Sequence, residues 1–124
     1  MELNPETDLA IDVANLTAEF RNFSLVMYRY SQHRAKVETS RDMAKAKLKE
    51  IKATVYKRVK SDTSAKHTQS SLEAEVDTDP TVIEAQTKLI RAEHDASTWA
   101  GAVESMRAKK DCLIQLGSDR RKEM

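Results

Sequence analysis

The residues best suited to chemistry are basic side chains at helical intervals in the middle of the chain. Lys45, Lys49, Lys52 and Tyr56 are separated by four, three and four residues, so they line one flank of a predicted helix. Ammonium groups at that pitch can follow a phosphate backbone, and a tyrosine ring offers a face for a base. This pattern predicts non-specific contacts to single-stranded nucleic acid. The candidate contacts, which we call the basic row, are Lys45, Lys49, Lys52, Tyr56, Lys57 and Arg58.

Charge is strongly segregated along the 124 residues, although the formal net charge is +1. Residues 29–66 carry twelve basic and four acidic side chains, a net charge of +8, whereas residues 1–28 carry −4 and residues 67–124 carry −3. A segment this basic can attract a polyanion. The alternative is a solvated helix face that pairs with the acidic segments of neighbouring subunits. A second basic cluster precedes a basic tail, and together they comprise Arg107, Lys109, Lys110, Arg120, Arg121 and Lys122.

The sequence contains no recognisable catalytic or metal-binding motif. No glycine-rich phosphate loop occurs, because the two glycines, Gly101 and Gly117, do not have its spacing, and the single Cys112 excludes a cysteine-rich zinc site. None of the three histidines has a second histidine or cysteine at metal-binding spacing. We therefore expect a protein that is not an enzyme and that uses no metal ion and no cofactor.

A 3.5-residue apolar repeat predicts the helix that carries the basic row. From Leu16 onward, alternating steps of four and three reach twelve positions, of which ten are apolar or aromatic. The exceptions, Arg34 and Arg41, either reach the edge of the seam or pair with acids near residues 93–95 or on another subunit. The repeat predicts a helix over about residues 12–60. Its expected seam includes Leu16, Phe20, Phe23, Met27, Leu48 and Ile51.

A second repeat follows a clear helix start, in which Asp79 can cap a helix that has Pro80 in its first turn. Apolar residues then recur at steps of three and four. We expect a helix over about residues 80–116, ended by Gly117 and followed by the basic tail at 117–124. Its expected seam includes Leu89, Trp99, Val103 and Met106.

The two repeats predict an all-α fold, in which residues 1–124 form a single domain of two long antiparallel helices with coiled-coil-like seams. Residues 61–79 are expected to be a flexible polar connector that holds a short helical turn. Further apolar residues lie outside the seams, namely Val13, Leu25, Val26, Tyr28, Val59, Ile83, Ile90, Ala100 and Ile114. They widen the apolar face beyond what two helices cover, so we expect a homo-oligomer, between a dimeric four-helix bundle and a closed ring.

Membrane insertion and export are not expected. No apolar run approaches the ~18 residues that would span a membrane. Residues 1–10 contain three acids and no basic residue, which is unlike a signal peptide. A helix lying on a membrane surface is disfavoured by Glu38, Asp42 and Glu50 within the basic segment. We expect a cytoplasmic protein, which for a viral protein means the cytoplasm of the host.

Three stretches, in this order and at this spacing, resemble one known family. They are Ile11-Asp12 with Leu16, Glu19 and Tyr30-Ser31, then Ile51 to Tyr56, then Trp99 with residues 102–109. They are similar to the opening helix, the DNA-binding motif and the closing helix of the bacteriophage UvsY-type recombination mediators. The family's motif is Leu-Lys-Ala-Arg followed by tyrosine; Lys52 matches its lysine, Thr54 stands in place of its arginine, and Arg58 lies one turn further on.

The resemblance implies a short all-helical protein that forms ring-like homo-oligomers, binds single-stranded DNA and helps a recombinase displace a single-strand-binding protein. It implies a non-catalytic mediator that helps load the recombinase onto DNA. The partners would be other copies of the chain, single-stranded DNA, the recombinase and the single-strand-binding protein. The residues leave one alternative open, a coiled-coil structural or adaptor protein that does not bind nucleic acid.

Overall fold

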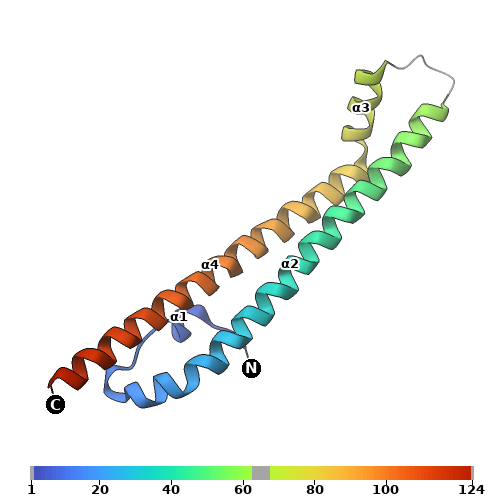
Figure 1. The fold of residues 1–124 in the computed structure, drawn as a ribbon. Coiled ribbons are helices and arrows are strands. Elements are labelled where there is room, and N and C mark those ends of the chain that lie inside the picture. The colour runs from blue at the N-terminus through green and yellow to red at the C-terminus, as the bar shows by residue number, and fades with distance from the viewer. Residues whose placement is uncertain (1, 63–67, 124) are drawn as a thin grey trace. The chain divides into compact units, whose positions relative to one another are not determined.

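The computed structural model describes residues 2–62 and 68–123, and all regular elements among them are helical (Figure 1). The two long helices are α2, over Leu16–Ser61, and α4, over Pro80–Glu123. The predicted all-α fold with two long antiparallel helices is confirmed. The shorter elements are α1 over Pro5–Asp8, the 3-10 turn η1 over Val13–Asn15, and α3 over Gln69–Thr78.

The chain divides into two compact units, each of which contains one segment of α2 and one segment of α4. The terminal unit comprises residues 1–36 and 96–124, and the hairpin unit comprises Val37–Asp95. Within each unit the two long segments run antiparallel. The basic row belongs entirely to the hairpin unit, because α2 carries all six of its residues between positions 45 and 58.

The core of the terminal unit forms where α2 and α4 present their apolar repeats to one another. Tyr30, Val103 and Met106 are at most 1% exposed and pack together. Four of the predicted seam residues are more open, since Phe20 is 44% exposed and Phe23, Met27 and Trp99 are half-buried. Side chains that pack against this core are Leu3, Leu9, Phe23, Val26, Met27, Trp99 and Ala102.

The core of the hairpin unit joins α2, α3 and α4. Its buried residues are Leu48, Val55, Val76, Val82, Ala85 and Leu89. Ile51, another predicted seam residue, is half-buried and packs against this cluster. α3 contributes Val76 to this cluster. Leu72, which is also buried, lies four residues earlier and therefore shares one face of α3 with Val76.

Side-chain caps start α3 and α4 in the hairpin unit. The Thr68 hydroxyl accepts a hydrogen bond from the backbone N–H of Ser71, at 3.1 Å, and starts α3. The Asp79 carboxylate accepts one from the backbone N–H of Thr81, at 2.9 Å, and starts α4. The capping role predicted for Asp79 is confirmed. Each cap satisfies a backbone donor that the first helical turn leaves without a partner.

Two element boundaries differ from the sequence prediction. Part of the expected connector forms α3, which has ten residues rather than a single turn; positions 63–67 of the connector lie outside the described residues. α4 does not end near Leu116 but continues to Glu123, so the predicted stop at Gly117 is wrong. Gly117 instead provides close packing, because a Cβ atom there would lie 3.2 Å from the Phe20 ring. Basic residues in the last turn also favour the longer helix.

We expect Tyr30→Phe to lower the free energy of unfolding by about 1–2 kcal/mol, measured by urea denaturation. The buried Tyr30 hydroxyl donates a 2.6 Å hydrogen bond to the Asp8 carboxylate. Burial, and next this hydrogen bond, raise the pKa of the Tyr30 hydroxyl above its ordinary value. The matched control is Tyr28→Phe, at a ring that is 60% exposed, and its effect should stay within about 0.5 kcal/mol. Equal effects at both positions would contradict this role of Tyr30.

Candidate nucleic-acid interface

Three lysines of the basic row are exposed on α2 and have no partner among the described residues. Lys45, Lys49 and Lys57 make no ion pair or hydrogen bond with residues 2–62 or 68–123. By contrast, the nearby Lys47 pairs with Glu50 at 3.6 Å. Lys45 and Lys49 are one helical turn apart, so their ammonium groups extend from the same flank of the helix. These are the positions at which a phosphate can bind without displacing a carboxylate.

The other two cations of the basic row already have carboxylate partners in the hairpin unit. The Lys52 Nζ atom lies 3.7 Å from Asp77 Oδ1, and its side chain is 43% exposed. Arg58 binds the Asp79 carboxylate and lies on the opposite flank of the buried stripe from Lys45 and Lys49. Hydrogen bonds from Thr81, and next the contact with Arg58, hold the pKa of Asp79 below its usual value. These two cations therefore serve the packing of α2 against the start of α4 and the end of α3.

Tyr56 borders a shallow groove of about 420 Å³ between α2 and α3. The ring packs against the hairpin core and is half-buried, so part of its surface remains open to solvent. Lys60 Nζ lies 5.9 Å from the ring centroid, within the range of a cation–π contact. Lys60 was not included in the basic row, although it follows Tyr56 by four residues and therefore extends the same flank. The other residues lining the groove are Lys52, Ala53, Glu73, Val76 and Asp77.

Thr54, at the position of the family's motif arginine, has a local structural role. Its hydroxyl donates a 3.1 Å hydrogen bond to the backbone carbonyl of Glu50, one turn earlier in α2. Arg58, which lies one helical turn after Thr54 and could replace the charge of the motif arginine, is bound to Asp79. The charge that the basic row makes available to a phosphate therefore comes from its lysines.

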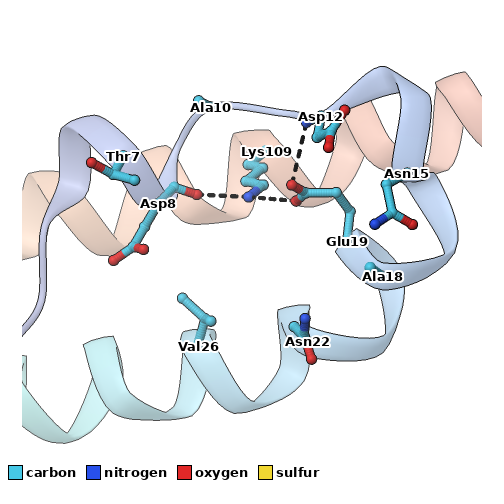
Figure 2. A pocket seen from close by; sticks show the side chains of 10 residues that line it. All are labelled: Thr7, Asp8, Ala10, Asp12, Asn15, Ala18, Glu19, Asn22, Val26 and Lys109. Carbon is cyan, nitrogen blue, oxygen red and sulfur yellow. Dashed lines mark hydrogen bonds and ion pairs between the residues drawn. The ribbon is translucent and has the colours of Figure 1, made fainter. Parts of the chain in front are cut away.

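The second basic cluster is largely neutralised within the terminal unit. Arg107 binds Glu104, and Lys109 Nζ lies 2.8 Å from Glu19 Oε2. Figure 2 shows Lys109 reaching into a pocket of about 180 Å³, where it also donates a 2.6 Å hydrogen bond to the backbone carbonyl of Asp8. The Lys109 side chain is only 9% exposed. Lys109 thus holds the N-terminal segment against α2 and α4 and is not positioned to bind DNA.

The Glu19–Lys109 contact predicts a pH-dependent contribution to stability. The hydrogen bond from Lys109 lowers the pKa of Glu19 below its ordinary value. A lowered folded-state pKa adds stability above the unfolded pKa of about 4.3, and that stability is lost as the pH falls through the folded value. We expect Glu19→Gln to cost about 1–2 kcal/mol at pH 7 and much less near pH 3, measured by urea denaturation. The same cost at both pH values would contradict the prediction.

The described part of the chain contains neither a metal-binding cluster nor a membrane-spanning helix. Residues 2–62 and 68–123 contain no group of three or more His, Cys, Asp or Glu side chains suited to a metal ion. Over the same residues, no helix combines the length and the apolar character needed to cross a membrane.

Comparison with known proteins identifies the fold. No protein-family model matches the chain, and no curated protein sequence matches it. The crystal structure of the recombination mediator protein UvsY of bacteriophage T4 matches with a TM-score of 0.84. The match covers 97% of this chain and 93% of that one, at 14% sequence identity. The resemblance inferred from the sequence is therefore confirmed as a shared fold.

Proposed function

We propose that this chain is a non-catalytic recombination mediator that binds single-stranded DNA and helps load a recombinase onto it. The observation that carries the proposal is the likeness to the UvsY structure over 97% of the chain, combined with free lysines on the hairpin unit. The phosphate contacts would be made by Lys45, Lys49 and Lys57, with Lys60 beside Tyr56. Lys52 and Arg58 would join them only by leaving Asp77 and Asp79.

We also propose that the working form is a homo-oligomer. Large apolar side chains remain more than 40% exposed in the single chain, namely Val13, Phe20, Leu25, Tyr28, Met43, Ile83, Ile90 and Ile114. Apolar surface of this extent supports burial between copies. An oligomer would also multiply weak lysine–phosphate contacts, because each further contact on one DNA strand becomes intramolecular. The DNA would be held in a form suited to the recombinase, with no bond made or broken.

The test is a fluorescence-anisotropy titration of a labelled oligothymidylate with the full chain at several salt concentrations. Phosphate contacts release counterions, so affinity should fall steeply between about 50 and 200 mM salt. Each contact with a single strand contributes a slope of about 0.7 in log K against log salt. An absence of binding at about 50 mM salt would overturn the proposal.

The alternative function is a coiled-coil adaptor, and the ion pairs of the hairpin unit favour it. Lys52 with Asp77, and Arg58 with Asp79, show that part of the basic row already has carboxylate partners. An adaptor would extend this pattern, using Lys45 and Lys49 to bind an acidic protein surface. The same titration separates the two functions, because an adaptor of this kind leaves the anisotropy of the oligonucleotide unchanged.

A further inference from the structure

A second basic surface lies in the terminal unit, around a hollow of about 690 Å³ beside Trp99. One face of α2 supplies Arg29, Gln32, His33 and Lys36, whose spacing of three, one and three residues places them side by side. α4 supplies Trp99. None of these residues belongs to the basic row. We call this surface the Trp99 hollow.

The Trp99 ring is held in place from within the protein while part of it lines the hollow. Its centroid lies 4.2 Å from that of His33, with an interplanar angle of 69°, and 5.9 Å from that of Tyr30. Tyr30 is completely buried, so the tryptophan rests on the core of the terminal unit. An aromatic ring fixed in this way can stack with a ligand at little cost in conformational entropy.

We propose that the Trp99 hollow is a second contact for single-stranded DNA, in which Trp99 stacks with a base and Arg29 and Lys36 bind the adjoining phosphates. This inference rests on the proposed function and adds a base-contacting site to it. Both lining cations lie on one face of α2 and seven residues apart, which is two helical turns or about 10.5 Å. Their long side chains can converge across this separation to reach the phosphates on either side of a base that is bound between them.

Glu2 is the one acidic side chain that lines the Trp99 hollow. Its carboxylate repels a phosphate, so the backbone of the strand would lie toward Arg29 and Lys36 and away from Glu2. Replacing this carboxylate with a neutral amide should therefore strengthen binding. If Glu2 had only a structural role, replacing it with glutamine would not increase the affinity for DNA.

The test uses Trp99 itself as the reporter, since it is the single tryptophan of the chain. Oligothymidylate is titrated into the full chain while tryptophan emission and the anisotropy of labelled DNA are both recorded. A second titration uses an abasic oligonucleotide of equal length, which keeps the phosphates and lacks the bases. We expect oligothymidylate to quench the emission and the abasic strand to bind without comparable quenching.

The outcomes separate this inference from the function on which it rests. A rise in anisotropy without quenching, or equal quenching by the abasic strand, overturns the stacking site and leaves DNA binding intact. No rise in anisotropy overturns both.

Charge variants provide an independent test of the Trp99 hollow. The double variant Arg29→Gln, Lys36→Gln should weaken oligothymidylate binding by on the order of tenfold and reduce quenching at a fixed DNA concentration. The matched control, Lys88→Gln with Arg91→Gln, removes the same charges from α4 in the hairpin unit and should change quenching little. Glu2→Gln should raise affinity by up to a few fold. Equal losses in the two double variants, or a loss with Glu2→Gln, would overturn the assignment.

Discussion

Replacing both Lys45 and Lys49 with alanine will weaken binding to oligothymidylate by on the order of 10–100-fold at about 50 mM salt. The two side chains are exposed, lie on one flank of α2 and have no partner among the described residues, so their charge is available to phosphates. Losing two contacts lowers the slope of log K against log salt by about 1.4 for a single strand. Anisotropy titrations at four or more salt concentrations measure both the affinity and the slope.

The matched control removes two lysines that already have partners. Lys47 pairs with Glu50 and Lys88 pairs with Glu84, and both lysines belong to the hairpin unit. The double variant Lys47→Ala, Lys88→Ala has the same net charge as the Lys45–Lys49 variant, so the comparison separates position from total charge. We expect it to retain most of the affinity and of the salt slope. If both double variants lose affinity equally, the predicted contact by Lys45 and Lys49 is wrong.

Met106→Ala will lower the free energy of unfolding by about 2–5 kcal/mol. Met106 is completely buried and packs with Tyr30 and Val103 at the centre of the terminal unit. Truncation removes apolar contacts and leaves a cavity, because α2 and α4 are held apart by the neighbouring large side chains. Urea denaturation followed by far-ultraviolet circular dichroism, at one fixed protein concentration, gives the difference.

The control for this substitution is the same change at an exposed position. Met43 is 68% exposed in the hairpin unit, so Met43→Ala should change the free energy of unfolding by no more than about 0.5 kcal/mol. A loss at Met106 no greater than the loss at Met43 would contradict the assignment of Met106 to the core.

Much of the fold follows from the sequence, because a long apolar repeat near 3.5 residues has few structural solutions. The same repeat that predicts α2 includes the buried Tyr30, and the repeat that predicts α4 includes the buried Val103 and Met106. The capping of α4 by Asp79 was likewise predictable from the Asp-Pro pair. Local sequence is sufficient to predict these features, because each repeat and the Asp-Pro pair lie within or next to the helix that they specify.

The remaining features depend on contacts between residues far apart in the chain. Lys109 was predicted as part of a second basic cluster, yet it pairs with Glu19, 90 residues earlier. Gly117 was predicted to end a helix, and its packing against Phe20 depends on the pairing of α2 with α4. For α3 a signal was present, because Leu72 and Val76 share one helical face, but the polar composition around them favoured a connector.

The arginines in the first repeat illustrate the same limit. Arg34 was expected to pair near residues 93–95 or to reach the edge of the seam, and its guanidinium lies 4.0 Å from Glu104, with the side chain 32% exposed. Arg41 pairs with Asp42, its neighbour in sequence. For Arg34 the repeat shows only that a cation occupies the seam, whereas its partner Glu104 is determined by the alignment of the two helices.

The most direct test of a DNA-binding homo-oligomer is the mass of the protein in solution, measured by sedimentation velocity with and without a labelled oligothymidylate. We expect a multiple of the 14.0 kDa chain mass for the protein alone, and co-sedimentation of the DNA with that assembly at low salt. A folded species of 14.0 kDa, sedimenting separately from free DNA, would contradict it.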